Sequence, residues 1–295
     1  MALFAKTAET PHSLLTKLIA QNLEVPDKQE ALQYLTFVGH YRLKGYWFHL
    51  VDPATKKFRP GTSFDTIKNR YEFDREIRAL ILESAERLEV ALRNSICNFL
   101  SLRYSPHWYL DGSLFKPERR YGLGQMLSKI EREVDRSQEK AFIESYYSKY
   151  DEPYLPPSWA MCECVTLGMW SRTYKILRDT NDKKSISSKF GISQVEVFES
   201  WIHTLTVIRN MAAHHDRFLH NKLRVSPANH NLKKIKFSDN KSVYAALTVI
   251  HVLLESIGFH HAFRERIIGL QNKYGEAMMQ ELGFPKWWPN KANGW

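Results

Sequence analysis

The chain has 295 residues, of which 43% are hydrophobic and 25% are charged, and this composition excludes a mainly disordered protein. It contains only 13 glycines and 12 prolines, which argues against a turn-rich all-β fold. The 42 Lys and Arg residues outnumber the 32 Asp and Glu residues by ten, and such a surplus favours a nucleic acid or an anionic membrane surface as partner.

Helical periodicity dominates the N-terminal part of the sequence. A short amphipathic helix is expected from Ser13, and a second from Asp27 to about Gly39. The aromatic segment 41–50 follows, and a loop or hairpin at 52–61 is the one place where we allow strand. From Ser63 to about Leu102, apolar residues recur at helical spacing without an internal proline or glycine, which predicts one long helix.

Five more helices are expected after residue 105, where Ser-Pro ends the long helix. Their expected ranges are 125–150, 158–178 after a proline cluster with Ser158 as N-cap, 194–219, 241–259 and 261–282. The pattern predicts an all-α protein. We expect an N-terminal extension at 1–60, packed on a helical domain at 61–285 and followed by an aromatic tail at 286–295.

The cysteines and the apolar segments indicate the cell compartment. Cys97, Cys162 and Cys164 are an odd set without the spacing of a zinc or redox motif, so we expect free thiols. The N-terminus lacks the apolar block of a signal peptide, and the apolar stretch 243–254 is shorter than the roughly 20 residues that a membrane span needs. We therefore predict a cytoplasmic protein without a membrane partner.

The predicted helix 194–219 contains the residues of greatest chemical interest. Its apolar stripe has the alternating spacing of three and four that is typical of a core-facing seam: Phe198, Trp201, Leu205, Ile208, Ala212, His215 and Leu219. His215 is therefore expected to be a buried core histidine. His214 lies about 100° further round, on a polar face shared with His203 and Asn210 and flanked by Arg209. The small residues Ala212 and Ala213 allow another helix to approach closely.

Arg209, Asn210 and His214 suit the cleavage of an RNA phosphodiester. The ribose 2′-hydroxyl must lose a proton as it attacks phosphorus and the leaving 5′-oxygen must gain one, and histidine can do either near neutral pH. Arginine can hold the phosphate through paired hydrogen bonds, and asparagine can orient the imidazole or bind an RNA oxygen. This chemistry requires no metal and no cofactor.

Residues 209–214, Arg-Asn-Met-Ala-Ala-His, match the R-N-x-x-x-H signature of HEPN-domain ribonucleases. The chain also resembles the Abi-like (AbiD/AbiF) family of bacterial abortive-infection proteins at residues 41–47, 71–78, 86–93, 157–160 and 201–217. The resemblance implies a HEPN-type helical bundle, metal-independent RNA cleavage, and a role in phage defence or as the toxin of a toxin–antitoxin system. It also implies relatedness to type VI CRISPR effectors, which have two such motifs in one chain.

A second motif is not complete in this sequence, because Asn98 stands where residues 93–98 would need a histidine. We therefore expect a homodimer whose two-fold axis lies near Ala212 and Ala213 and pairs two copies of the motif. Two other functions remain open. One is a non-catalytic RNA-binding module held by a small antitoxin-like RNA, and the other is a partner-sensing subunit without an RNA role.

Further basic residues are candidates for RNA binding. Between Arg217 and Lys241, seven basic residues face one acidic residue, which predicts either a solvated loop or, as we favour, a track for the RNA backbone. The seven are Arg217, Lys222, Arg224, Lys233, Lys234, Lys236 and Lys241, and the first six are the candidate RNA-binding residues. Arg87 and Arg93 either belong to an ion-paired helix face or line the site from a neighbouring helix. The aromatic residues at 41–47 either stack RNA bases or, as we favour, pack the extension onto the bundle.

Overall fold

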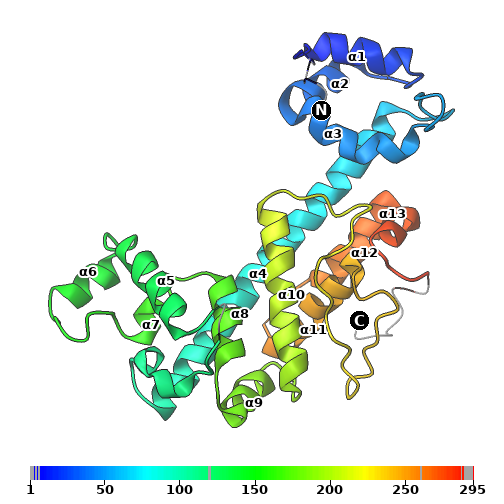
Figure 1. The fold of residues 1–295 in the computed structure, drawn as a ribbon. Coiled ribbons are helices and arrows are strands. Elements are labelled where there is room, and N and C mark those ends of the chain that lie inside the picture. The colour runs from blue at the N-terminus through cyan, green and yellow to red at the C-terminus, as the bar shows by residue number, and fades with distance from the viewer. Residues whose placement is uncertain are drawn as a thin grey trace.

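One 40-residue helix, α4 (Phe64–Arg103), runs through the length of the molecule (Figure 1). The computed structural model describes residues 3, 5, 7–118, 121–259, 261–286, 288 and 295. The predicted long helix is confirmed, and it begins after Ser63, whose hydroxyl accepts a hydrogen bond from the Thr66 backbone N–H. At 1.5 Å per residue its length is about 60 Å, which allows separate groups of helices to pack along it.

The N-terminal helices pack around the first turns of α4. They are α1 (Pro11–Ala20), α2 (Lys28–Tyr34), the π-helical turn η1 (Leu35–Gly39), α3 (His40–Trp47) and the 3-10 turn η2 (Phe48–Leu50). Tyr34 makes edge-to-face contacts with Phe64 and Tyr71 of α4. In the aromatic segment Tyr46 is buried as expected, whereas Tyr41 is 92% exposed.

Residues 52–61 contain a turn and no named strand. One isolated bridge joins Val51 to Phe58, and throughout the described part of the chain extended residues form only such isolated bridges. The fold is therefore all-α, as predicted.

A second group of helices lies at the opposite end of α4 (Figure 1). It contains the 3-10 turns η3 (Trp108–Leu110) and η4 (Gly112–Leu114) and the helices α5 (Leu123–Asp135), α6 (Ala141–Tyr147) and α7 (Ser158–Met161). The single helix predicted at 125–150 is thus two helices. Ser158 is the first residue of α7 and not its cap, which is Pro157. The helix predicted to reach Arg178 is interrupted at 162–166 and resumes as α8 (Leu167–Ile176).

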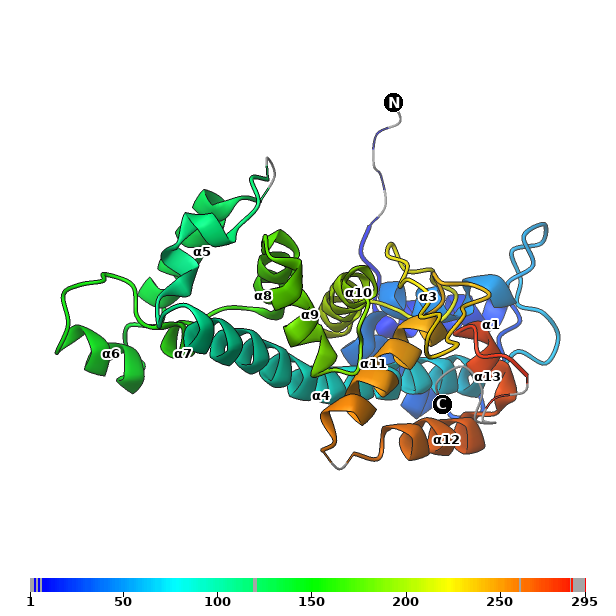
Figure 2. The same ribbon diagram turned by 90° about the horizontal axis from the view of Figure 1, so that it is seen from below.

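The central group of helices surrounds α10 (Val195–Ala213), which packs against α4, α8 and α11 (Val243–Ile257). Helix α9 (Thr180–Ser188), which the sequence pattern did not predict, begins where the Asp179 carboxylate accepts a hydrogen bond from Asn181 N–H at 2.7 Å. The helix predicted at 261–282 is divided by Gly275, whose φ of +90° favours glycine, into α12 (Phe263–Tyr274) and α13 (Glu276–Glu281). Figure 2 shows α8 and α10 on one side of α4 and α12 on the other.

The described part of the C-terminal tail belongs to the core. Trp295 stacks on His251 with ring centroids 4.7 Å apart, and its indole N–H donates to the Thr248 hydroxyl at 2.8 Å. Trp288 is also buried, and Trp287 lies outside the described residues. Among the described helices, none combines the length and the apolar character needed to cross a membrane.

Candidate active site at the C-terminal end of α10

Helix α10 ends at Ala213, six residues earlier than predicted. His214 is its C-cap, and His215 adopts a left-handed conformation with φ of +60°. The N–H of His215 donates to Ala212 O at 3.1 Å and the N–H of Asp216 donates to Met211 O at 2.8 Å. This is the Schellman arrangement that satisfies the last carbonyls of a helix. The prediction that His215 is a buried core residue is therefore wrong, because the chain leaves the helix axis there and the side chain is exposed.

The three candidate catalytic residues lie together at this helix end. Asn210 and His214 are exposed, and the Arg209 side chain is partly exposed. The backbone N–H of His214 donates to Asn210 O at 2.9 Å, so the histidine follows Asn210 by one helical turn. Arg209 Nη1 donates weakly to Asn210 Oδ1 at 3.4 Å. The side chains of the motif are thus accessible to a ligand from one surface.

Glu89 of α4 lies between Arg209 and the start of α8. One of its carboxylate oxygens accepts a hydrogen bond from the Leu167 backbone N–H at 3.0 Å, and the other lies 3.9 Å from Arg209 Nε. A guanidinium has five N–H donors. Because the contact with Glu89 is long, most donors of Arg209 remain available for a phosphate oxygen.

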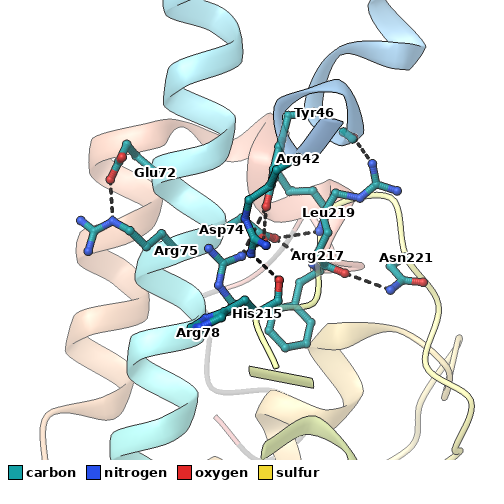
Figure 3. A network of polar contacts seen from close by, with 12 residues as sticks. Arg42, Tyr46, Glu72, Asp74, Arg75, Arg78, His215, Arg217, Leu219 and Asn221 are labelled. Carbon is teal, nitrogen blue, oxygen red and sulfur yellow. Dashed lines mark hydrogen bonds and ion pairs between the residues drawn. The ribbon is translucent and has the colours of Figure 1, made fainter. Parts of the chain in front are cut away.

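The segment after α10 is held in place by Asp74 of α4, whose side chain is fully buried (Figure 3). Asp74 Oδ1 accepts hydrogen bonds from the backbone N–H groups of Phe218 and Leu219, both at 2.9 Å. Its other oxygen accepts from Tyr46 Oη of α3 at 2.9 Å and pairs with Arg78. Burial raises the pKa of the Asp74 carboxyl, and Arg78 with these hydrogen bonds opposes the rise. One carboxylate therefore joins α3, α4 and the segment that follows the motif.

Two arginines complete the connection between α3 and this segment (Figure 3). Arg42 donates to the carbonyl of His215, and Arg217 donates to the carbonyl of Gly45. Arg217 also lies over the Phe48 ring, with its guanidinium carbon 5.1 Å from the ring centroid. A Cβ on residue 45 would come within 3.0 Å of Arg217 Nη1, so the close approach favours glycine.

A basic cavity of about 780 Å³ lies between α3 and residues 215–224. Among the described residues that line it, one is acidic, Asp216, and four are cationic: Arg42, Lys44, Arg217 and Arg224. Tyr41, the most exposed aromatic residue of the segment, is at its edge. We call this site the α3 cavity. Because it begins at His215, it is directly adjacent to the C-cap histidine, and its charge suits a polyanion.

The predicted basic track is divided along α10. Arg217 and Arg224 line the α3 cavity, and Lys222 is ion-paired with Asp239 at 3.0 Å. The chain then runs back along α10, where Trp201 Nε1 donates to Ala228 O at 2.9 Å. Lys233 lies beside Gly191, which comes shortly before the N-terminal end of α10. The motif is at the C-terminal end of this 19-residue helix, which is about 28 Å long. Lys234 and Lys236 neighbour Lys233 in sequence and are exposed. The structure does not bring these three lysines to the motif.

Arg87 and Arg93 both lie on α4, on either side of Glu89 in sequence. Arg87 is exposed. Arg93 forms an ion pair with Glu163 at 2.6 Å, in the segment between α7 and α8. The partner of Arg93 in this ion pair therefore lies outside α4.

One family comparison covers the elements that build this site. The sequence profile described as Abi-like protein matches residues 33–220, from the end of α2 to the segment that Asp74 holds. The chain belongs to the Abi-like protein family. The family suggests a role in abortive infection, and so in phage defence. No curated protein and no solved structure matched the chain.

Sequence reasoning missed Asp74 and Glu89 as residues of this Abi-like site, although both fall in the stretches that resemble the family. The signal that could have identified Asp74 is an acidic residue at an apolar position of a long helix, where an unpaired charge is costly. The cysteines are free thiols, as expected. In the described part of the chain, no group of three or more His, Cys, Asp or Glu residues could hold a metal ion.

Proposed function

We propose that this Abi-like protein is a metal-independent endoribonuclease of the HEPN type that acts in phage defence. The observation that supports the proposal most strongly is the exposed Arg209, Asn210 and His214 at the end of α10, where the next residue, His215, lines the cationic α3 cavity. Their sequence matches the ribonuclease signature, and family membership independently suggests abortive infection. Toxin behaviour in a toxin–antitoxin pair belongs to the same proposal.

The reaction needs two proton transfers and one stabilised phosphate. The ribose O2′ loses its proton and bonds to phosphorus, while the P–O5′ bond breaks and O5′ receives a proton. The products are a 2′,3′-cyclic phosphate and a 5′-hydroxyl. His214 serves as acid or base, Arg209 binds the phosphate oxygens as their charge develops, and Asn210 positions the imidazole or an RNA oxygen. All three roles belong to side chains of this chain.

The α3 cavity is the proposed path for the RNA backbone as it leaves the motif. Lys44 and Arg224 supply cationic side chains there, and the backbone contacts of Arg42 and Arg217 fix the shape of the wall. Binding of this kind releases counterions and weakens as salt rises. The same salt dependence is expected for a small antitoxin-like RNA that occupies the site without being cleaved. Only turnover therefore separates the ribonuclease from the non-catalytic RNA-binding module.

A second copy of the chain is proposed to supply the second histidine. Ala212 is fully buried in its own protomer, so of the two alanines only Ala213 is accessible to a partner helix. A two-fold axis near Ala213 would place two motifs opposite each other, and isologous dimers are the commonest closed assemblies. Specific activity measured across a dilution series should fall as the dimer dissociates, and a monomer that keeps full activity contradicts this arrangement.

The proposed function is tested by incubating the purified protein with single-stranded RNA in EDTA. We expect cleavage with 2′,3′-cyclic phosphate ends, because the acid, the base and the phosphate clamp are side chains. A matched substrate with a 2′-deoxy residue at each cut site should resist, because it lacks the attacking hydroxyl. Activity that disappears in EDTA and returns with Mg²⁺ would reject the mechanism. RNA that binds tightly and stays intact would favour the non-catalytic module.

A further inference from the structure

A second cavity, separate from the α3 cavity, lies between α5, α8 and α10. Its volume is about 420 Å³, which is within the range of small-ligand sites of about 300–1,000 Å³. Helix α10 contributes His203, Thr206, Val207 and Asn210, whose spacing of three, one and three places them on one helix face. Asn210 belongs both to this wall and to the proposed catalytic motif. We call the site the α8 cleft.

Three cationic side chains line the α8 cleft. Lys129 and Arg132 of α5 and Arg172 of α8 line it, and within the described residues none of the three forms an ion pair. The one acidic residue in the described lining, Glu133, is already paired with Arg136 at 3.0 Å. The cleft is therefore suited to an anionic group.

Tyr121 holds two of these cations in position. Lys129 Nζ and the Arg172 guanidinium carbon are each 5.1 Å from the centroid of its ring, which is the geometry of a cation–π contact. The Tyr121 residue is 9% exposed, and its buried hydroxyl has no hydrogen-bond partner in the described part of the chain. Burial raises the pKa of Tyr121 to about 12, so the hydroxyl remains a donor. Both cations keep their N–H donors available, and ordering them in advance lowers the entropic cost of binding.

The wall opposite these cations suits a nucleobase. The exposed side chains of His203 and Asn210 offer a ring for stacking and an amide for hydrogen bonds. His203 precedes Asn210 by about two helical turns, roughly 10 Å along the axis. A ligand that spans this wall reaches from the cations of the α8 cleft to the end of α10, where the reacting phosphate is proposed to lie.

We propose that the α8 cleft binds a nucleotide of the single-stranded RNA that flanks the phosphate held by Arg209, Asn210 and His214. The proposal rests on the proposed function in that RNA is the ligand. The RNA then passes from the α8 cleft across the end of α10 to the α3 cavity. The cleft selects the nucleotide next to the cut, and Arg172 and Lys129 bind its phosphate.

Binding without turnover tests the α8 cleft. The probe is a fluorescent single-stranded decaribonucleotide with 2′-O-methyl groups throughout, which cannot be cleaved because the attacking hydroxyl is blocked. Arg172→Ala and Lys129→Ala should each weaken binding about tenfold or more, the loss expected for one charge-assisted contact. The control is Lys184→Ala, which removes an exposed cation from α9 outside both cavities and should change the affinity little. Circular dichroism and thermal unfolding verify that each variant is folded.

The outcomes separate this proposal from the proposed function. Equal losses in all three variants would mean that only net charge is sensed, and unchanged affinity in the cleft variants would mean that RNA does not enter; either result overturns the proposal. If the cleft variants lose binding but the wild type cleaves no RNA, the cleft stands and the catalytic assignment fails. If His214-dependent cleavage occurs and the cleft variants bind and cut like wild type, the catalytic assignment stands and the cleft proposal fails.

Photo-crosslinking locates the nucleotide and distinguishes an RNA chain from a free nucleotide. Decamers with one 4-thiouridine, moved stepwise along the chain, should crosslink at one position to peptides within 121–133, 166–172 or 203–210. Crosslinks confined to residues 215–224 would overturn the proposal. Nucleoside 5′-monophosphates at millimolar concentration should compete with this crosslink. A monophosphate that binds in the cleft and is not displaced by the decamer would also overturn it.

Discussion

Asp74 Oδ1 accepts a hydrogen bond from the backbone N–H of Phe218 at 2.9 Å, across 144 residues of sequence. The donor lies four residues beyond the C-cap of α10, and the acceptor is fully buried in the first third of α4. The same carboxylate accepts from Leu219 N–H and Tyr46 Oη and pairs with Arg78. The end of the motif helix and the wall of the α3 cavity therefore depend on one side chain.

Asp74→Ala should lower the free energy of unfolding by about 3–5 kcal/mol, because it leaves a buried Arg78 and two backbone N–H groups without their acceptor. Urea unfolding followed by circular dichroism measures the change. Lys222→Ala is the control, since it breaks only the exposed ion pair with Asp239 and should cost less than about 1 kcal/mol. Equal costs in the two variants would show that Asp74 is not the connection we describe.

His215→Gly should raise the stability of the protein by up to about 1 kcal/mol, because His215 has a left-handed backbone at the position after the C-cap, where glycine has no Cβ penalty. The hydrogen bond from Arg42 reaches the backbone carbonyl of residue 215 and survives the change. His215→Ala is the matched control and should be nearly neutral, since the side chain is exposed. A destabilised glycine variant would mean that the imidazole itself supports the fold.

Stability should decrease as the pH falls from about 6.5 towards 4, partly through His251. Burial lowers the pKa of His251 to about 4, whereas an unfolded histidine titrates near 6.5. Between these values the unfolded chain binds the proton and the folded chain does not, so unfolding becomes easier as pH falls. His251→Phe should remove up to about one proton, or 1.4 kcal/mol per pH unit, from the slope of unfolding free energy against pH. An unchanged slope would contradict the assignment.

RNA binding should depend on Arg224 more than on Lys234. Arg224 lines the α3 cavity at the C-terminal end of α10. Lys234 follows Lys233 in sequence, and Lys233 lies beside Gly191, near the N-terminal end of the same helix. Arg224→Ala should weaken binding and reduce the slope of log affinity against log salt by about one. Lys234→Ala should change the slope little, and it is the matched control for loss of one positive charge. Equal slopes in both variants would support the continuous basic track and contradict the division of the segment.

The local sequence pattern predicted those elements whose periodicity and caps lie within one continuous stretch of the chain. Helix α4 was predictable from its periodicity and its Ser63 cap, and the stripe from Phe198 to Ala212 is buried as expected. The end of α10 was not predictable, because residues 215–226 contain no glycine or proline and Leu219 continues the apolar spacing. What ends the helix is a left-handed histidine and a carboxylate on another helix, and neither is visible in a local pattern.

The candidate site also has one part that the sequence predicted and another that it did not. The three motif residues were found because they are adjacent in sequence, and they lie together at the end of α10. The α3 cavity and the α8 cleft could not be found in this way, because each is assembled from separate stretches of the sequence. The α3 cavity joins α3 to residues 215–224, and the α8 cleft joins α5, α8 and α10. Charge counting along residues 217–241 grouped basic residues that the backbone then carries to opposite ends of α10, with Arg217 and Arg224 at one end and Lys233 at the other.

The central claim is that His214 is the acid or base of an RNA-cleaving site, and adjacent histidines allow it to be tested directly. Purified wild type, His214→Ala and His215→Ala are compared for initial rates of RNA cleavage in EDTA, with 2′,3′-cyclic phosphate ends as the readout. His214→Ala should be slower by about 10²–10⁴-fold with its helical circular dichroism spectrum intact, and His215→Ala should cleave at close to the wild-type rate. If His214→Ala cleaves like wild type, or if the folded His215→Ala protein is the inactive one, the account of this site is wrong.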